Sequence, residues 1–359
     1  MGTIAVIGAG NVGQTIAGHM TLNRHSVRMY SVWDQEFDPI RDRGGIELFG
    51  DIEGRAMPEL LTTDLEAAVS GVEVIVVAAP AFAHPGLSAS LAKVLTPEQL
   101  VVFQPSVLGS GVELSRQFAL ENRRPSLIAE SATSLYTCRL KEPARVFVGA
   151  IKDSIQISSL PSRRTQEVVD RLTPFFGEHY SAAVDSLAVG LSNSNPIYHV
   201  PPAVLNFKTV EEADRLPQHT LVTPRIAEVV DALDQERLSL SSTLHTDTTG
   251  FWRFLADAYG VTEGTFVDRV VQGYGRQAFP EPDSLTHRYF TEDIPFGLVT
   301  WTSIGREVGV DMPLTDGFIS ISSVLCGVDF QETGRTVDTL GLKGAGIDEI
   351  LAAFRNGVF

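Results

Sequence analysis

The chain has 359 residues, too many for one compact core of usual size, and its length predicts two domains. Hydrophobic residues make up 43% of the sequence and charged residues 20%, which is typical of a globular protein. The formal net charge of −16 argues against nucleic acid or an anionic membrane surface as the main partner, because either would repel the protein as a whole.

Cys138 and Cys326 are the only cysteines, too few for a disulfide framework, and this fits a reducing compartment. The sequence passes from Met1 directly into an apolar run without the basic segment of a signal peptide, and no apolar run reaches membrane-spanning length. We therefore expect a cytoplasmic protein.

The first predicted element is an apolar strand that leads directly into a glycine motif and a helix. Gly8, Gly10 and Gly13 form the pattern GxGxxG. In this pattern the first glycine permits a tight turn, the second lets the backbone approach a pyrophosphate, and the third lets the helix pack on the strand. A plain glycine-rich turn is the alternative, but it does not explain the strand and helix on either side. The motif predicts an NAD(P) site at Gly8, Gly10, Asn11, Val12 and Gly13.

Short apolar runs follow at residues 26–30, 72–80, 100–105 and 126–131, and helical stretches lie between them. This is the β-α-β rhythm of a parallel, doubly wound sheet. Two extended pieces, 145–151 and 153–160, follow without a convincing helix between them and are expected to complete the sheet as a mixed edge. A helix over 165–176 and a short segment over 180–184 come next.

Beyond about residue 185 the strand patterns fade and helical spacing predominates, with helices expected at 224–240, 250–259, 262–273, 299–308 and 313–325. We therefore predict an α/β protein with a Rossmann dinucleotide-binding domain over residues 1–184. An all-α helical domain that binds substrate and carries the catalytic residues is expected over residues 185–359.

The end of the second strand bears on the choice of cofactor. An acidic residue there, about 20 residues beyond the glycines, often binds the adenosine ribose, and Ser31 and Asp34 are the candidates. A hydroxyl at Ser31 tolerates a 2′-phosphate that a carboxylate would repel, so Ser31 favours NADP over NAD. Asp34 and Glu36 lie close by, and no arginine directly follows Ser31; a phosphate clamp would have to come from Arg28, Arg41 or Arg43.

Ligands of open α/β sheets gather outside the carboxyl ends of the strands. Ala79 and Pro80 follow the strand in residues 72–80 and are expected to border the cofactor. His84, a little further on, either approaches the ribose or nicotinamide or faces solvent.

Polar residues crowd the stretch after the next strand, from Glu130 to Arg139. Tyr136 and Thr137 in this stretch are candidate substrate contacts. Cys138 has no base beside it in the sequence and is predicted to pack rather than to act as a nucleophile.

Two clusters stand out in the second half. The first contains Asn193, Asn195 and His199, and in the second Arg288 is followed four and five positions later by acids, the later of which is Asp293. Together they offer an imidazole, a carboxylate that can orient it, and a guanidinium that can grip a substrate carboxylate.

Three motifs of the chain resemble those of the opine dehydrogenases, the family of octopine, nopaline and carboxyethyl-norvaline dehydrogenases. They are GAGNVG at 8–13, Asn-x-Asn-x-x-x-His-x-Pro-x-x-x-Leu-Asn at 193–206, and Arg-Tyr-Phe-x-Glu-Asp-x-x-x-Gly at 288–297. The resemblance extends over essentially the whole chain, and the histidine motif is its most specific part. It implies that the amine of an amino acid condenses with a 2-oxo acid such as pyruvate. The resulting imine is then reduced by a nicotinamide hydride to a secondary-amine dicarboxylate.

By this resemblance His199 is the acid/base, Asp293 is its partner, and Arg288 is an anchor for a substrate carboxylate or for the structure. Asn193 and Asn195 are candidate substrate contacts. An imidazole suits the proton transfers of imine formation near neutral pH. The alternative for His199 is a buried structural histidine, and the alternative for Arg288 and Asp293 is an internal salt bridge. The family pattern is broken where Val200 precedes a proline pair and where Ser31 replaces the acid of several NAD-using members.

Two other functions stay open. One is another NAD(P)-dependent dehydrogenase of this architecture, acting on a 2-hydroxy acid, a ketone or a polyol phosphate; such enzymes use a lysine, and only Lys208 lies near the histidine motif. The other is a non-catalytic NAD(P)-sensing protein. The other histidines have no metal-site spacing. Small molecules are the expected partners, and the sequence identifies neither the amino acid nor the 2-oxo acid. It also leaves open the oligomeric state, including a homodimer.

Overall fold

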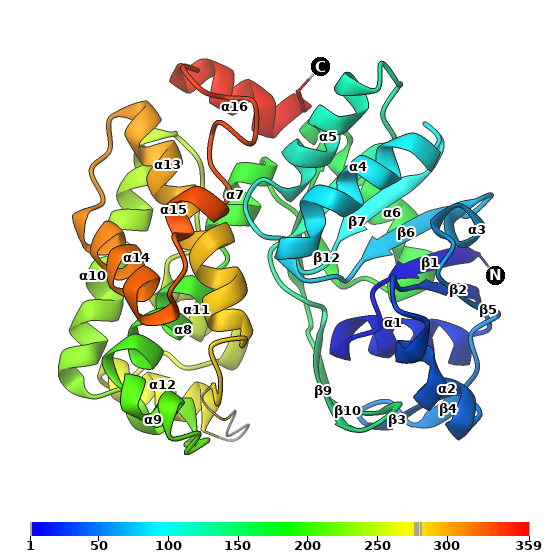
Figure 1. Ribbon diagram of the computed structural model, residues 1–359, viewed down its shortest axis with the longest axis horizontal. Coiled ribbons are helices and arrows are strands. Elements are labelled where there is room, and N and C mark those ends of the chain that lie inside the picture. The colour runs from blue at the N-terminus through cyan, green and yellow to red at the C-terminus, as the bar shows by residue number, and fades with distance from the viewer. Residues whose placement is uncertain (1, 276–279, 281, 359) are drawn as a thin grey trace. The chain divides into compact units, whose positions relative to one another are not determined.

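The computed structural model describes residues 2–275, 280 and 282–358 (Figure 1). Contacts between Cα atoms divide the chain into unit 1, Met1–Gly190 with Ala352–Phe359, and unit 2, Leu191–Leu351. The division into domains at residues 184 and 185 stays a prediction.

Unit 1 is built on an eight-stranded sheet in the order β12-β11-β8-β7-β6-β1-β2-β5. Neighbouring strands from β8 to β5 run parallel, β11 is antiparallel to β8, and β12 is parallel to β11. The edge is therefore mixed, as predicted for residues 153–160. The strands are β1 (Thr3–Ile7), β2 (Ser26–Tyr30), β5 (Leu60–Thr62), β6 (Val74–Val77), β7 (Leu100–Phe103), β8 (Leu127–Ser131), β11 (Ile155–Leu160) and β12 (Tyr180–Ala182).

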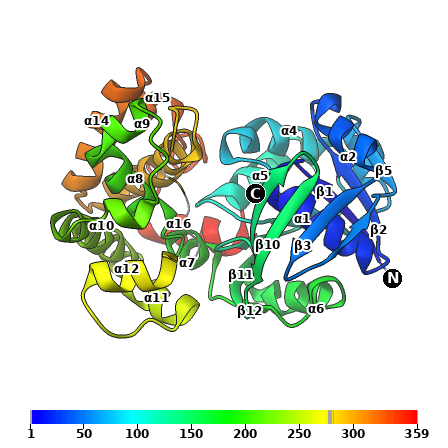
Figure 2. The same cartoon turned by 90° about the horizontal axis from the view of Figure 1, so that it is seen from below.

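The central strands are apolar along their whole length because helices cover both faces of the sheet. Every residue of β6 and of β7 is buried. Figure 2 shows α4 and α5 on one side of the sheet and α6 on the other. The helical segments of unit 1 are α1 (Asn11–Leu22), η1 (Asp34–Phe37), α2 (Asp38–Arg43), α3 (Leu65–Val69), η2 (Ala81–Ala83), α4 (His84–Val94), α5 (Ser110–Leu120), η3 (Ser162–Arg164), α6 (Thr165–Phe176) and α7 (Ser186–Leu191), the last of which crosses the unit boundary.

A second sheet of unit 1, in the order β4-β3-β10-β9, corrects one prediction. Residues 145–151 form β10, which pairs with β9 and β3 rather than with the main sheet. The strands are β3 (Ile46–Gly50), β4 (Gly54–Ala56), β9 (Tyr136–Glu142) and β10 (Arg145–Ile151). Inward-facing Val146 and Val148 of β10 are fully buried, so this sheet shares the apolar core of unit 1. β10 follows β9 after only two residues and pairs antiparallel with it as a hairpin, which draws it away from the main sheet.

Unit 2 is helical. The five helices predicted from residue 224 onward all appear, with bounds shifted by a few residues. The segments are α8 (Asn195–Leu205), α9 (Phe207–Glu211), η4 (Gln218–Leu221), α10 (Pro224–Thr243), α11 (Phe251–Tyr259), α12 (Phe266–Tyr274), the π-helix η5 (Tyr289–Leu298), α13 (Val299–Val308), α14 (Pro313–Cys326), α15 (Phe330–Thr333) and α16 (Ile347–Asn356). The second half of α16, from Ala352 onward, belongs to unit 1.

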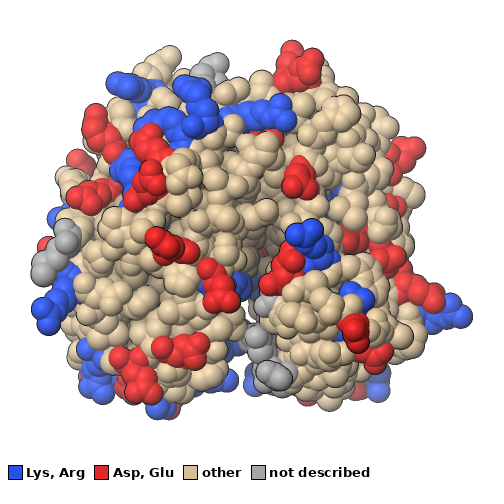
Figure 3. Space-filling model, turned by 180° about the vertical axis from the view of Figure 1, so that it is seen from behind, with Lys and Arg blue, Asp and Glu red and all other residues tan. Residues whose placement is uncertain are grey.

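Charged side chains of both signs are distributed over the face in Figure 3 and are separated by broad uncharged areas. In the described part of the chain, no helix is both long enough and apolar enough to cross a membrane.

A buried ion pair holds the centre of unit 2 together. The side chains of Asp234 and Arg237 on α10 are 2% and 0% exposed and form a salt bridge. Arg237 also donates to the backbone oxygens of Leu191 and Thr249, and Asp234 accepts from Phe251 N at 2.7 Å. The pair therefore joins α10 to the chain at Leu191 and to the start of α11. A buried charge pair is costly to form, but breaking it leaves one charge uncompensated.

We expect Arg237→Met to lower the free energy of unfolding by about 3–5 kcal/mol, because it leaves the Asp234 carboxylate buried alone. The matched control is Arg225→Met on the same helix, which removes an arginine that is 87% exposed and paired with Glu228. That change should cost at most about 1 kcal/mol. Urea unfolding of the three proteins measures both values, and equal effects at the two positions would contradict the assignment.

Candidate functional site

The glycine motif of unit 1 adopts the geometry that each glycine was expected to provide. Gly8 has φ +115°, and a Cβ there would lie 2.9 Å from Ala78 O. A Cβ on Gly13 would lie 2.0 Å from Gly8 O, so α1 can pack on the strand only with glycine at this position. Gly10 has open space beside its Cα instead, since a Cβ there would meet no protein atom within 4 Å.

The start of α1 fits the pyrophosphate of a dinucleotide. Gly10 is the N-cap of α1 and supplies no side-chain hydrogen bond to the first turn. The first N–H groups of a helix lack partners within the helix and carry partial positive charge. Open space at Gly10 lets an anion reach these groups directly.

Two other predicted cofactor residues of α1 face the protein with their side chains. Asn11 Oδ1 accepts a hydrogen bond from Leu140 N at 2.8 Å, which ties α1 to β9. Val12 is partly buried and packs against the core. Their contribution to cofactor binding would therefore come from the backbone of the first turn.

The loop after β6 carries Ala79 and Pro80 at the carboxyl edge of the sheet, and Ala79 is held by a buried histidine. His84 is only 1% exposed, with its Nε2 3.0 Å from Ala79 O and its Nδ1 2.9 Å from Ser110 Oγ. The solvent-facing alternative for His84 is therefore wrong. Ser31 directly follows β2 and is 5% exposed.

Tyr136 and Thr137 lie at the start of β9. Tyr136 is 3% exposed and its hydroxyl is 2.8 Å from His19 Nδ1, whereas Thr137 is half-buried and pairs with Ala150 of β10. Cys138 packs against the core, as predicted, and burial raises the pKa of its thiol.

Lys152, which the sequence analysis did not single out, lies next to this segment. Its ammonium donates to Thr133 Oγ1 at 2.9 Å and to Ser134 O at 2.7 Å, just beyond the carboxyl end of β8. Burial lowers the pKa of Lys152 to about 8. No sequence pattern marks this lysine, because its partners lie almost 20 residues earlier, in the loop between β8 and β9.

In unit 2 the structure brings His199 of α8 and Asp293 of η5 together. His199 Nδ1 lies 2.7 Å from Asp293 Oδ2, and the two side chains are 16% and 1% exposed. Asp293 Oδ1 is buried and has no hydrogen-bond partner among the described residues. The bond at Nδ1 fixes the orientation of the ring and directs Nε2 away from the carboxylate. This arrangement suits an acid/base whose second nitrogen exchanges a proton.

The N-terminus of α8 is defined by the predicted asparagines and a proline. Asn193 Oδ1 accepts from Asn195 N at 3.1 Å, and Pro196 occupies the first turn. Proline is favoured there because the missing N–H would have no helical partner. Asn193 is 8% exposed. These residues place His199 one turn inside the helix.

The proline pair inside α8 explains a polar contact that the sequence analysis missed. Pro202 has no N–H to donate to Tyr198 O one turn earlier. Gln218 of η4 donates from Nε2 to this oxygen at 3.2 Å, and its Oε1 accepts from the Tyr289 hydroxyl at 3.3 Å. The Tyr289 ring in turn stacks on His199, with centroids 3.9 Å apart and planes at 13°. Gln218 thus helps to orient the surface on which the imidazole lies.

Arg288 forms an ion pair with Glu292, one turn further along the same segment. The Glu292 carboxylate raises the pKa of the guanidinium, and Asp293 adds to this effect. The Arg288 side chain is 42% exposed, whereas that of Glu292 is 9% exposed. The salt-bridge alternative considered for Arg288 is therefore present, with Glu292 as the partner.

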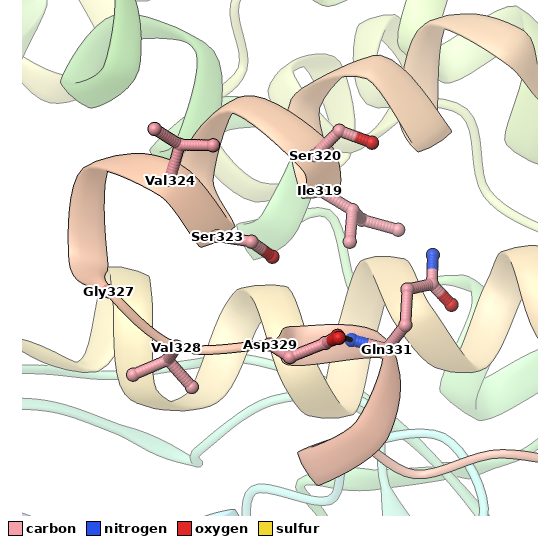
Figure 4. Close-up of a pocket in the computed structure, with 8 residues that line it drawn as sticks. All are labelled: Ile319, Ser320, Ser323, Val324, Gly327, Val328, Asp329 and Gln331. Atoms are coloured by element: carbon pink, nitrogen blue, oxygen red, sulfur yellow. Dashed lines mark hydrogen bonds between the residues drawn. The ribbon is translucent and has the colours of Figure 1, made fainter.

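A hollow of about 450 Å³ lies elsewhere, where α14 ends and α15 begins (Figure 4). It is lined by Ile319, Ser320, Ser323, Val324, Gly327, Val328, Asp329 and Gln331. Asp329 caps α15 by accepting from Gln331 N and Glu332 N, so the only carboxylate of the hollow has a structural use. The hollow offers no acid/base pair. No group of three or more His, Cys, Asp or Glu side chains within the described residues is arranged to hold a metal ion.

Comparisons with known proteins agree with both units. Residues 182–326 match the family described as NAD/NADP octopine/nopaline dehydrogenase, alpha-helical domain. Residues 3–118 match the N-terminus of NAD-dependent glycerol-3-phosphate dehydrogenase. The chain is 30% identical over 345 residues to an opine dehydrogenase of Arthrobacter sp. (strain 1C). The matched region covers 95% of this chain and 96% of the relative.

Two solved structures share the fold. An octopine dehydrogenase in complex with NADH and agmatine has a TM-score of 0.81 at 19% identity, covering 100% of this chain and 99% of that one. An NADP+-bound yersinopine dehydrogenase has a TM-score of 0.73 at 14% identity, covering 98% and 97%. The predicted fold class, a Rossmann dinucleotide-binding domain followed by a helical domain, is confirmed.

Gly10→Ala should separate binding from folding. The new methyl group meets no protein atom, and the φ of −78° at Gly10 suits alanine, so the free energy of unfolding should change by less than about 1 kcal/mol. The methyl group would, however, occupy the space through which a pyrophosphate approaches. We expect the Kd for NADH or NADPH, measured by calorimetry, to rise at least about tenfold. Gly13→Ala is the contrasting variant and should destabilise the fold itself by about 1–3 kcal/mol. Unchanged cofactor affinity in Gly10→Ala would contradict this site.

Lys152 should make stability depend on pH in a defined direction. Because its pKa is about 8 in the folded protein and about 10.5 when unfolded, the unfolded chain binds more protons between these values. Raising the pH from 7 to 10.5 should therefore stabilise wild type relative to Lys152→Met by up to about 3 kcal/mol. Urea unfolding at several pH values measures the difference, with exposed Lys141→Met on β9 as the control. Parallel pH profiles for wild type and Lys152→Met would contradict the assignment.

Proposed function

The chain belongs to the opine dehydrogenase family, and from this we infer that it is an NAD(P)-dependent oxidoreductase acting on a carbon–nitrogen bond. It condenses the amine of an amino acid with the keto group of a 2-oxo acid. Reduction of the resulting imine yields a secondary-amine dicarboxylate.

The observation that carries the proposal is the His199–Asp293 pair. A buried carboxylate that is hydrogen-bonded to Nδ1 of an imidazole orients Nε2 for proton exchange. This is an acid/base arrangement, and it lies at the most specific motif of the family. Lys208, which the alternative dehydrogenase reaction would require, is 80% exposed and paired with Glu212 on α9. Its position therefore does not favour that alternative.

We assign the proton transfers to His199. The neutral amine adds to the keto carbon as a proton moves from its nitrogen to the keto oxygen. The hydroxyl that forms accepts a proton from Nε2 and leaves as water, which gives a protonated C=N bond. The cofactor, when bound, supplies the hydride that the carbon of the C=N bond accepts. Asp293 keeps the ring in one tautomer and balances the positive charge of the imidazolium. Unit 1 contributes the cofactor site and unit 2 the acid/base pair.

The substrate-binding residues are proposals of the same kind. Arg288 can bind a substrate carboxylate with the part of its guanidinium that Glu292 does not use, because the planar group presents five N–H donors. Asn195 lies about one turn before His199 on α8, and Asn193 lies two residues earlier, just before the N-cap of the helix. Tyr136 and Thr137, at the start of β9 in unit 1, are proposed as further substrate contacts.

The cofactor is NADH or NADPH, held at Gly8, Gly10, Asn11, Val12 and Gly13, with Ala79 and Pro80 at the neighbouring strand end. The prediction of NADP depends on Ser31, whose small hydroxyl does stand directly after β2. The choice of cofactor follows from the groups around that hydroxyl.

The test is a screen for NADH and NADPH oxidation. Pyruvate, 2-oxoglutarate and glyoxylate are each combined with a panel of amino acids, and mass spectrometry identifies the product. A product whose mass equals both substrates minus water plus two hydrogens supports the proposal. Oxidation that needs a keto acid but no amino acid, and yields the hydroxy acid, would replace it with the alternative reaction.

His199→Ala should lower kcat by about 10²–10⁴-fold, because general acid–base catalysis contributes about that much. Its affinity for NADH and NADPH should match that of wild type, since unit 1 carries the cofactor fingerprint. Asp293→Asn should lose a large part of the same factor, and the double variant should be little slower than His199→Ala, because the two residues act as one unit. Near-wild-type turnover of a folded, cofactor-binding His199→Ala protein would make the histidine structural.

A further inference from the structure

The end of β2 carries a carboxylate that the strand itself does not supply. Ser31 directly follows β2, and its hydroxyl donates to Glu36 Oε2 while accepting from Trp33 N at 3.2 Å. Glu36 lies in η1 and is exposed. The short 3₁₀ turn thus folds back and places an acid beside the residue that occupies the usual ribose-reading position.

This carboxylate lies at the edge of the sheet that holds the glycine motif. β1 and β2 are parallel neighbours with Ile7 opposite Tyr30, and Gly8 N donates to Tyr30 O at 2.8 Å. The residues after both strands therefore leave the sheet on the same side. In such sheets the adenosine half of a dinucleotide extends from the glycine turn toward the end of this second strand.

The hydrogen bond to Glu36 changes what the Ser31 hydroxyl can offer to a ligand. Its single hydrogen is used by Glu36, so toward a ligand it presents lone pairs rather than a donor. A 2′-phosphate has acceptor oxygens and needs donors or cations. The Ser31 hydroxyl, on which the prediction of NADP depends, instead holds the Glu36 carboxylate in place.

The three arginines named above as a possible 2′-phosphate clamp already bind other groups of the protein. Arg41 binds Asp34 at 2.7 Å and Asp38 at 3.0 Å, and Arg28 donates to two backbone oxygens. Arg43 binds Glu47 at 2.9 Å and Glu142 at 3.2 Å. The loop formed by residues 34–41 holds three carboxylates, Asp34, Glu36 and Asp38, against one guanidinium. Its charge is therefore negative, and it would repel a phosphate dianion.

We propose that Glu36, positioned by Ser31, binds the adenosine ribose hydroxyls and makes the enzyme selective for NADH over NADPH. This inference rests on the proposed dehydrogenase function and identifies its cofactor. The ribose hydroxyls of NADH donate to the carboxylate, whereas NADPH brings a phosphate of about two negative charges to the same place. Glu36 is a specificity-determining residue outside the strand, five positions after the one where an acid is usual.

The test measures binding of the two dinucleotides without substrates, by quenching of intrinsic fluorescence or by calorimetry. We expect wild type to bind NADH at least about tenfold more tightly than NADPH, and Glu36→Gln to reduce this ratio at least about tenfold, mainly by gaining affinity for NADPH. The matched control is Asp38→Asn, which removes the same charge from the same loop but does not touch Ser31. It should change the ratio by less than about threefold.

Competition by adenosine fragments gives a second reading. AMP should displace NADH from wild type better than adenosine 2′,5′-bisphosphate does, and Glu36→Gln should reverse or abolish this order. Ser31→Ala should weaken NADH binding without creating a preference for NADPH, because the carboxylate stays but is less well held.

The outcomes separate this inference from the proposed function. Wild type that prefers NADPH, or a Glu36→Gln protein with an unchanged ratio, would overturn the role of Glu36 while leaving the dehydrogenase proposal intact. Equal shifts in Glu36→Gln and Asp38→Asn would overturn it too, since only the general charge of the loop would then matter. Binding of neither dinucleotide by a folded protein would overturn both.

Discussion

The arrangement of unit 2 depends on one buried carboxylate. Asp293 is 1% exposed, and only one of its oxygens has a hydrogen-bond partner within the described part of the chain, the His199 imidazole at 2.7 Å. Burying an ionised carboxylate is costly unless an opposite charge or several donors compensate for it. The imidazole is the group in position to do so, and it must be held firmly. The prolines of α8, the Gln218 contact to Tyr198 O and the Tyr289 ring that stacks on His199 all serve this requirement.

The parts of the fold that could be predicted are those encoded within a short stretch of chain. The glycine motif, the apolar strands of the main sheet other than β5, and the five helices expected from residue 224 onward follow from local patterns, and their bounds agree to within a few residues. The second sheet could not be predicted in this way. Its strands β3 and β10 pair with partners about 100 residues apart in sequence, as in Val146 opposite Leu48. β4 has only three residues and begins with a glycine, so no periodicity reveals it.

The same distinction applies to the sites. His199 and Asp293 belong to motifs and were recognisable. The residues that orient them are distant in sequence, and their contacts exist only in the folded protein. Gln218 is required because Pro202 leaves a helical carbonyl without a donor, and nothing near residue 218 in the sequence indicates this. Glu36 was visible as a nearby acid, yet its importance depends on a hydrogen bond to Ser31 that a 3₁₀ turn brings about. Lys152 owes its lowered pKa to burial, and its ammonium donates to the loop between β8 and β9.

The π-helix η5 shows how neighbouring charges are kept from competing. π-Helical segments are rare and occur often at functional sites. Along this one, Arg288 and Glu292 form one pair a turn apart, and Tyr289 and Asp293, each one residue further on, both contact His199. An arginine bonded to Asp293 would compensate its charge and weaken its hold on the imidazole. Because Glu292 engages the guanidinium, the second carboxylate is left to the histidine. The two consecutive acids of the Arg-Tyr-Phe-x-Glu-Asp motif therefore have different tasks, and the order in which they follow the arginine decides which one orients the imidazole.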